Sequence, residues 1–319
     1  MISYPVSDAD LDAGIDVFDP AWRAKAKAAT DACRAAGRYV KEDAAGKTIE
    51  GLWGDIKDEL TARQNGKCCY CERLLESRAF GRVEHDVEHF RPKSTVKNWF
   101  TADVKSDFPD WPATLHMGGD SAKGYFLLPF DARNYATSCK TCNSALKRDY
   151  FPIAGTARLT AVSPKAARLE KPFLIFPVGE WDERAESLIE FEGITARPVH
   201  DATADLLRHW RARVTIRFFR LNHGGTGPAP APGEEGRENL YRERAEAISA
   251  LAFALDALET ATTAAKRKTC ENKIKRCISA KSSHTNCCQS FLRRWSDPAR
   301  RAAAVEIWQG VEDYLNSQG

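Results

Sequence analysis

The sequence Cys68-Cys69-Tyr70-Cys71 is the first of two C-x₂-C pairs, and Cys139-Lys140-Thr141-Cys142 is the second. Each pair directs two thiolates toward one point, and two pairs complete the tetrahedral set of four sulfur ligands that suits Zn²⁺. We therefore expect one zinc ion bound by Cys68, Cys71, Cys139 and Cys142. Four sulfur ligands leave no position open for substrate, so this zinc is predicted to be structural. Buried or redox-active thiols are the alternative interpretation.

A stretch rich in carboxylates and imidazoles, Glu84–Lys93, lies between the two pairs. Within it, His89 can act as a general base because its unperturbed pKa is about 6.5. Glu88 supplies an oxygen ligand for Mg²⁺ or a similar hard cation. Asn143 directly follows the second pair, so zinc would fix the position of its side-chain oxygen, and Asn134 can hold the His89 ring by a hydrogen bond. This set predicts phosphodiester hydrolysis, which requires an activated water and a hard cation in fixed geometry.

The second ligand of that cation stays open at this point. Residues 82–90 are predicted to form a strand, in which His85, Val87 and His89 share one face and Glu88 lies on the other. Glu88 and His89 can both reach one ion only where the strand twists or ends. Otherwise His85 becomes a candidate ligand.

Basic side chains accompany the site. Arg91, Lys93, Lys147 and Arg148 are spaced to meet phosphates. Two further segments, 205–220 with Arg213 and Arg217, and 261–300, are rich in Lys and Arg. Local basic faces of this kind are what contact with a nucleic-acid backbone requires. A solvated helix face is the alternative for each segment.

The ordered set resembles the HNH endonucleases of the ββα-metal type, because His89, Asn134 and Asn143 follow the order of that family's His-Asn-His/Asn signature. The resemblance is narrower still to the PtuB-like HNH nucleases of Septu and of some retrons, which are bacterial anti-phage systems. It rests on the phrases KCCYCE (67–72), VEHFRPKS (87–94) and Cys142-Asn143 with Lys147 and Phe151-Pro152. Weaker phrases extend it to about residue 245, and the resemblance does not include residues 250–319.

The resemblance implies roles for four residues. His89 is the expected general base and Asn134 the residue that orients it. Glu88, in the place usually held by Asp, and Asn143 are the expected ligands of a catalytic Mg²⁺ or Mn²⁺. The expected products carry 5′-phosphate and 3′-hydroxyl ends. The implied partners are DNA, with RNA as an alternative substrate, and an ABC-type ATPase that resembles PtuA.

Composition is ordinary for a globular protein, with 43% hydrophobic and 29% charged residues in a chain of 319. The net charge of +3 does not by itself indicate a polyanionic partner. The first residues lack the pattern of a signal peptide, and no apolar run reaches the ~18–20 residues of a transmembrane helix. We expect a cytoplasmic protein of the α+β class, predominantly helical.

The expected organisation has five parts. They are an N-terminal helical region (1–65), a core with both cysteine pairs (66–155), short strands with a basic helix (156–223), a flexible linker (224–236) and a basic helical region (237–319). Helices are predicted at 20–36, 48–64, 139–148, 201–221 and 237–260, and strands at 82–90, 125–130, 171–177 and 187–191.

Five residues near the C-terminus could suggest a second metal site: Cys270, Cys277, His284, Cys287 and Cys288. Their seven-residue spacing is too long for a local chelate and favours one buried helix face. The rival to a nuclease is a zinc-folded nucleic-acid-binding or adaptor protein without catalysis. A redox thiol protein is a more distant alternative.

Overall fold

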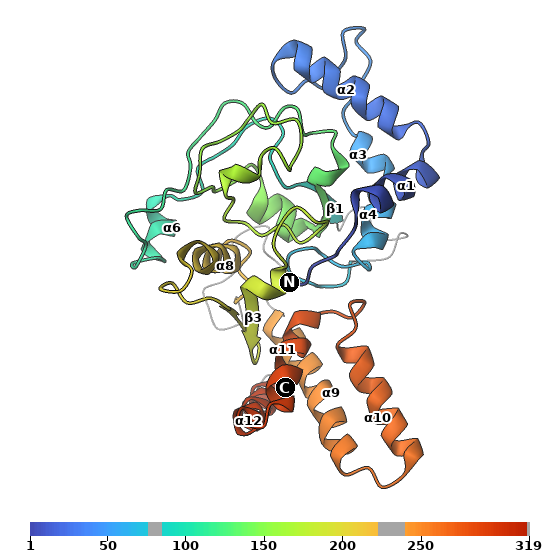
Figure 1. The fold of residues 1–319 in the computed structure, drawn as a ribbon, viewed down its shortest axis with the longest axis vertical. Helices are drawn as coiled ribbons and strands as arrows, with labels where there is room; N and C mark the ends of the chain where they lie inside the picture. Colours follow the sequence, from blue (N-terminus) through green and yellow to red (C-terminus); the bar gives the residue numbers. More distant parts are fainter. Residues whose placement is uncertain (76–84, 223–239, 318–319) are drawn as a thin grey trace. The chain divides into compact units, whose positions relative to one another are not determined.

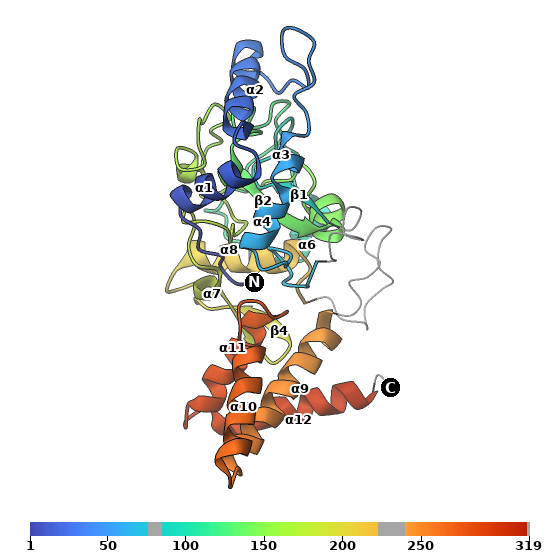
Figure 2. The same cartoon turned by 90° about the vertical axis from the view of Figure 1, so that its right-hand side faces the viewer.

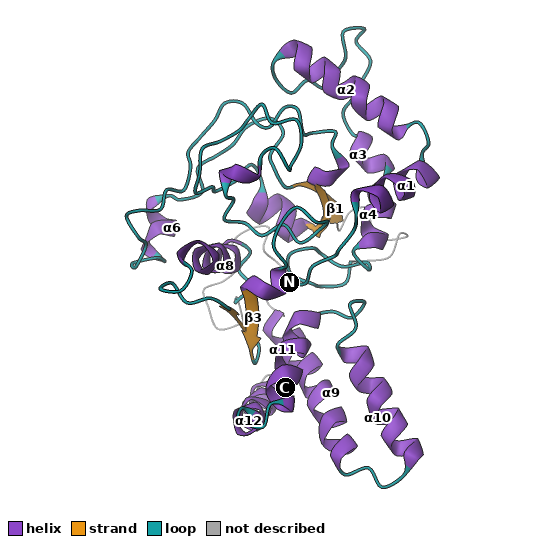
Figure 3. Cartoon of the chain, viewed as in Figure 1, coloured by secondary structure: helices purple, strands orange, loops and turns teal. Residues whose placement is uncertain are grey.

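A computed structural model describes residues 1–75, 85–222 and 240–317. The chain divides into two compact units. The N-terminal unit consists of residues 3–69 and 75–183, and the C-terminal unit of residues 1–2, 70–74 and 184–319. Both are built of helices with one short pair of strands each, an α+β fold (Figures 1 and 3). The predicted fold class is confirmed at this level.

The N-terminal unit begins with helices that follow local sequence signals. Ser7 caps α1 (Asp8–Phe18) by accepting a hydrogen bond from the Asp10 N–H. Helix α2 (Trp22–Ala36) ends at Gly37, whose φ of 62° is the left-handed conformation that glycine adopts without strain. The single helix predicted over 48–64 is two short helices, α3 (Leu52–Asp55) and α4 (Lys57–Arg63).

Two antiparallel strands and a helix form the centre of this unit. Strand β1 (His85–His89) pairs with β2 (Tyr135–Cys139), and His89 lies opposite Tyr135. Helix η2 (Thr141–Lys147) follows β2 directly. Figure 2 shows α4 beside the two strands. The strand predicted at 82–90 and the helix predicted at 139–148 are therefore present as β1 and η2, whereas the second strand is Tyr135–Cys139 and not the predicted 125–130.

The hydrophobic core of the unit lies between α1–α4 and the strands. Val87 and Tyr135 from the strands pack there with Trp22, Ile56 and Phe130. The remaining short elements of the unit are α6 (Ala102–Ser106), η1 (Ala132–Asn134) and η3 (Arg168–Glu170). The core thus fixes one face of β1 against the N-terminal helices.

The C-terminal unit contains α7 (Ala185–Leu188), β3 (Ile189–Glu192), β4 (Thr195–Pro198) and α8 (Leu206–Phe218). Four more helices follow: α9 (Leu240–Glu259), α10 (Ala264–Cys277), α11 (Thr285–Ser296) and α12 (Arg301–Ser317). Gly193 makes the β3–β4 turn with a φ of 56°, and a Cβ there would come within 3.2 Å of Ile307. Buried Arg244 of α9 donates to the main-chain oxygens of Ile194 and Leu221, which ties α9 to the strands.

Several predicted elements differ from the structure. Residues 125–130 and 171–177, predicted as strands, form turns and loops whose aromatic and apolar side chains are buried. In the second segment, a single β-bridge between Pro172 and Ile153 replaces a strand ladder. The second strand of the central pair is instead Tyr135–Cys139. The predicted linker at 224–236 lies outside the described residues. Among the residues described, no helix combines the length and apolar character needed to cross a bilayer.

Candidate functional site

Four cysteine sulfurs converge as the two C-x₂-C pairs predict. The Sγ atoms of Cys68, Cys71, Cys139 and Cys142 all lie within 4.8 Å of one another. A tetrahedral zinc with Zn–S bonds of about 2.3 Å requires sulfurs roughly 3.8 Å apart, so the cluster fits the ion with small adjustments. No disulfide joins any of the four. The cluster can therefore hold a structural zinc ion.

Gln64 holds the first cysteine pair against β2. Its buried amide donates to the main-chain oxygens of Lys67 (3.0 Å) and Thr137 (2.8 Å), and accepts from the Thr137 N–H (2.7 Å). The Cys69 N–H also donates to the Thr137 oxygen. Gly66, with a φ of 69°, reverses the chain just before the pair. These contacts bring residues far apart in sequence to one cluster.

His89 is held by a main-chain carbonyl and two aromatic rings. Its Nε2 lies 3.2 Å from the Pro129 oxygen. Because a carbonyl can only accept, Nε2 carries the proton and Nδ1 carries the lone pair. Trp53 and Tyr135 pack against the imidazole, with ring centroids at 4.7 and 5.0 Å. Burial, and then the charge of Lys93, lower the pKa of His89 to about 3, so the ring is neutral at neutral pH.

Asn134 differs from its expected role. Its side chain accepts from the Arg91 N–H (2.9 Å) and donates to the Arg91 oxygen (3.0 Å) and the Leu128 oxygen (3.4 Å). The predicted hydrogen bond from Asn134 to His89 is therefore wrong for this structure, where the Pro129 carbonyl takes that place. Asn134 instead fixes the backbone immediately after β1, because an amide pairs well with one peptide unit.

Glu88 lies on the other face of β1 and pairs with Lys147 at the end of η2. The carboxylate and ammonium are 3.3 Å apart, with side chains 3% and 0% exposed. Burial raises the pKa of Glu88 to about 7 against the opposing effect of Lys147, and burial lowers the pKa of Lys147. Glu88 Oε1 makes no well-formed hydrogen bond. A buried oxygen without a hydrogen-bond donor fits a cation ligand, and Lys147 supplies the positive charge here.

Glu88 and His89 are the last two residues of β1, and strand alternation places their side chains on opposite faces. Lys93 and Lys147 both act electrostatically on both residues. His85, the alternative ligand, is buried nearer α4, where Lys57 donates to its main-chain oxygen. The Nδ1 of His85 has no hydrogen-bond partner among the described residues.

Asn143 lies on an unusual helix. Helix η2 is a π-helix, and the Arg148 N–H donates to the Asn143 oxygen (2.8 Å), five residues back. Arg148 itself adopts a φ of 44°, which is strained for a residue with a Cβ. Single π-turns and strained residues concentrate at functional sites. Asn143 is partly exposed and lies one turn before Lys147 on this helix.

The basic residues predicted to meet phosphates separate into two groups. Arg91 is buried in an ion pair with Glu170 (3.0 Å), which leaves it no access to a phosphate in this structure. Lys93 lies 4.1 Å over the Trp53 ring and is partly exposed, and Arg148 is exposed. On α8, Arg213 stacks on Trp210 at 4.3 Å, and Arg217 is partly exposed. Most residues of α8 are buried, so it is a core helix with a basic edge.

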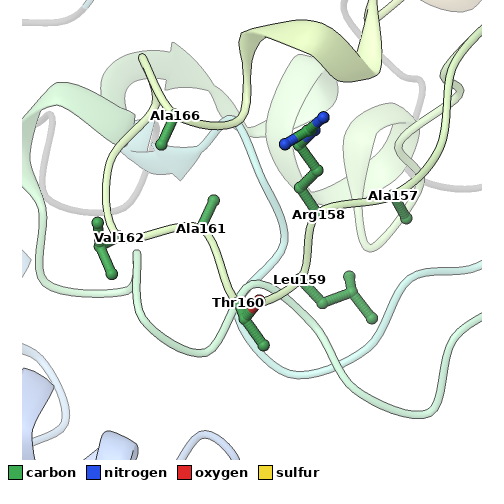
Figure 4. Close-up of a pocket in the computed structure, with 7 residues that line it drawn as sticks. All are labelled: Ala157, Arg158, Leu159, Thr160, Ala161, Val162 and Ala166. Carbon is green, nitrogen blue, oxygen red and sulfur yellow. The ribbon is translucent and has the colours of Figure 1, made fainter.

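Two cavities lie away from the strands and η2. One, of about 560 Å³, is lined by seven residues of the segment 157–166 (Figure 4), and Arg158 is the single ionisable residue among them. The other, of about 420 Å³, is lined in part by charged residues, of which Arg23 and Arg133 pair with Asp12.

The C-terminal cysteines do not form a metal cluster in the structure. Within the described residues, the four N-terminal cysteines are the one group of three or more Cys, His, Asp or Glu that converges on a point. His284 bonds to Glu243 (2.9 Å), and the Cys287 thiol donates to the Gly193 oxygen (3.3 Å). Burial raises the pKa of Cys287 to about 12. Cys287 and Cys288 are buried on α11, whereas Cys270 and Cys277 of α10 are only partly buried, so the single buried helix face that their spacing favours is not present.

Replacing Lys147 alone is predicted to destabilise the protein more than replacing it together with Glu88. Lys147→Met leaves a buried carboxylate without its counter-charge, which should lower the free energy of unfolding by about 3–5 kcal/mol. The double variant Glu88→Gln, Lys147→Met removes both charges and should recover most of that loss. Urea unfolding of the zinc-loaded protein measures both. Equal stability of the single and double variants would contradict the pair's importance.

Sequence reasoning missed three contributors to this site: the Pro129 carbonyl, Trp53 and Tyr135. A carbonyl has no side-chain signature, so no sequence pattern marks Pro129. Tyr135 directly follows Asn134, and its hydroxyl also donates to the Pro129 oxygen. The one sequence feature that could have indicated Tyr135 is its position next to Asn134, a candidate site residue.

Comparison with known proteins gives a distant and partial relation. No family model matches the chain, and no solved structure matches it. The chain is similar to the Septu protein PtuB of Bacillus mycoides (strain KBAB4), with 28% identity over 122 residues. The similarity covers 38% of this chain and 34% of that relative. The similarity supports a relation to Septu PtuB over the aligned residues. The aligned part of this chain spans about a third of the relative's length.

Proposed function

We propose that this protein is a metal-dependent endonuclease of the HNH type that hydrolyses phosphodiester bonds in DNA. The observation that carries the proposal is the state of His89. Its Nε2–H is tied to the Pro129 carbonyl, which leaves Nδ1 as the nitrogen with the lone pair, and it adjoins Glu88 at the end of β1. A neutral imidazole with one nitrogen fixed as donor is a general base directed through the other nitrogen.

In the proposed reaction, His89 Nδ1 accepts the proton of the attacking water. The Pro129 carbonyl stabilises the resulting imidazolium by accepting the Nε2–H bond. Trp53 and Tyr135 restrict rotation of the ring, so the lone pair keeps one direction. Asn134 positions His89 indirectly by fixing the peptide at Arg91.

Glu88 and Asn143 would hold Mg²⁺ or Mn²⁺ in this proposal, and His85 is the less favoured ligand. Such a cation neutralises charge on the pentavalent phosphorus and on the leaving oxygen. The Glu88 carboxylate is enclosed with Lys147 in this structure, so cation binding requires Lys147 to move aside. Lys147, Lys93 and Arg148 are then available to contact phosphate oxygens.

The relation to Septu protein PtuB suggests a biological setting. We infer that the nuclease is an effector of anti-phage defence, controlled by an ABC-type ATPase partner similar to PtuA. Control is physically reasonable because uncontrolled cleavage would damage the host's own DNA.

A cleavage assay on plasmid, single-stranded DNA and tRNA tests the proposal. Each substrate is incubated with Mg²⁺, Mn²⁺ or EDTA, with and without the product of the neighbouring gene. We expect plasmid nicking that needs the divalent ion and leaves 5′-phosphate ends. Absence of cleavage of all three substrates under every condition, with zinc bound, would contradict it.

A zinc-folded nucleic-acid-binding protein without catalysis is the second candidate. The closed Glu88–Lys147 pair favours it, because an ammonium already supplies the charge that a cation would bring. Electron paramagnetic resonance with Mn²⁺ separates the two candidates. The nuclease requires Mn²⁺ binding that Glu88→Gln weakens, whereas the binding protein shows no such site.

A further inference from the structure

Helix α10 carries an unusual concentration of positive charge. Six of its fourteen residues are basic: Lys266, Arg267, Lys268, Lys273, Lys275 and Arg276. Glu271 is its single acidic residue, and none of its residues is buried. The helix therefore presents most of its charge to solvent.

These cations lack the partners that basic residues have elsewhere in the chain. On α2, Arg23, Lys25 and Lys27 pair with aspartates at 2.5–2.7 Å. Across the part of the chain that the structure describes, the six basic side chains of α10 make no ion pair. Arg267 donates to the Ala261 main-chain oxygen at 3.4 Å. Most of the charge on α10 is therefore not used within the described fold.

The placement of two cations opposes the stability of the helix itself. Lys266 and Arg267 lie in the first turn of α10, after the cap at Thr263, whereas Lys275 and Arg276 lie in the last turn, where cations are favourable. The first turn is the positive end of the helix dipole, where cations are unfavourable by about 0.3–1 kcal/mol each. The basic side chains of α10 have no ion-pair partners and partly destabilise the helix. Binding of an external anion therefore explains them better than a role in folding does.

Only one side of α10 packs on the protein. Cys270, Ile274 and Cys277 recur at helical spacing, are partly buried, and face α9, beside which α10 runs in Figure 1. The basic residues surround the helix on its other sides, because each residue rotates by about 100°. Lys266 and Lys273 fall on one flank of the α9-facing stripe, Arg267 on the other, and Lys268, Lys275 and Arg276 on the outer surface.

We propose that α10 docks on duplex nucleic acid and contacts the phosphates on both edges of a groove. A helix about 10–12 Å across fits the major groove of B-DNA, which is about 12 Å wide. Cations on both flanks suit a groove with phosphate rows on each side better than a single flat contact. The proposed contacts are to phosphates and not to base edges. They therefore position the duplex and do not recognise its sequence.

The proposal stands apart from hydrolysis. It concerns the C-terminal unit alone and needs neither His89 nor a catalytic cation. Binding is measured in EDTA, so failure of the nuclease proposal and failure of this one are separate results.

The test compares two sets of four charge-neutral substitutions in the full chain. The α10 variant carries Lys266→Gln, Lys268→Gln, Lys273→Gln and Lys275→Gln. The control variant carries Arg23→Gln, Lys25→Gln, Lys27→Gln and Arg34→Gln on α2, which changes net charge equally but removes ion-paired cations. Gln is nearly as good a helix former as Lys, and circular dichroism checks that helix content is kept.

Fluorescence anisotropy of a labelled 30-base-pair duplex is followed from 50 to 200 mM salt. Each lost phosphate contact should reduce the slope of log K against log salt by about 0.9. We expect the α10 variant to lose about 2–4 from the slope and at least tenfold in affinity, and the control variant to stay near wild type. Equal slopes for the two variants would overturn the proposal. The proposal would also be overturned if the α10 variant bound the duplex as tightly as wild type but no longer associated with an acidic partner protein.

Discussion

Replacing His89 with alanine is expected to lower metal-dependent cleavage by about 10²–10⁴-fold, the usual contribution of general acid–base catalysis. The loss should fall on the rate of cleavage rather than on nucleic-acid binding, because His89 is a small, enclosed side chain. Single-turnover cleavage of a plasmid with saturating Mn²⁺ measures the rate. Binding of the same plasmid in EDTA measures affinity.

The matched control is His116→Ala, which removes an exposed histidine of the same unit and should leave the rate unchanged. Free imidazole should partly restore cleavage to the His89→Ala protein, because the cavity left by the ring can admit it. A structural role would give no such rescue. If His89→Ala keeps full activity, zinc content and stability, His89 is not the general base and another residue must have that role.

The second large effect is expected from the cysteine cluster. Structural zinc sites contribute apparent binding free energies of about 10–16 kcal/mol, whereas whole domains are stable by about 5–15 kcal/mol. Cys68→Ser with Cys142→Ser removes one ligand from each pair. We expect this double variant to lose zinc and to be largely unfolded at 25 °C. Inductively coupled plasma mass spectrometry should give one zinc per wild-type chain and close to none for the variant.

Cys69→Ala is the control for this experiment, because Cys69 belongs to the same knuckle but lies outside the cluster of four ligands. Its zinc content should remain at one per chain, with a modest loss of stability from the buried site. Two zinc ions per wild-type chain would point to a second site that the described residues do not form. A folded and zinc-free double variant would mean that the cluster is ordinary buried thiol.

The ion pair between Glu88 and Lys147 connects the zinc cluster to the candidate catalytic residues. Lys147 ends η2, the helix that also contains Cys142, so loss of zinc should disturb the partner of Glu88. The cysteine variants should therefore lose any cleavage activity as a consequence of unfolding. The His89 variant should lose activity while remaining folded.

Local sequence signals were sufficient for a definite part of this protein. The C-x₂-C spacing predicts the zinc ligands, because two thiolates three residues apart chelate one ion whatever surrounds them. Helix α2 and its end at Gly37 follow from periodicity and from glycine's access to positive φ. The functional roles of Glu88, His89 and Asn143 remain predictions.

Local signals were not sufficient where a partner is distant or is a backbone atom. The 125–130 segment alternates too little to distinguish a strand from a packed loop, and tertiary contacts decide between them. The acceptor for His89 is a carbonyl 40 residues away, and the partner of Arg91 is Glu170, 79 residues away. No spacing rule predicts such pairs.

Sequence alone therefore predicted the four cysteines that converge in the structure, and the positions of β1 and η2. Tertiary structure decided which predicted residues are available for chemistry. It enclosed Arg91 with Glu170 and Glu88 with Lys147, and it left the cations of α10 in solvent. The physical reason is that chelation and helix capping act over a few residues. Burial of a charge depends instead on what the fold packs around it, and only the three-dimensional arrangement contains that information.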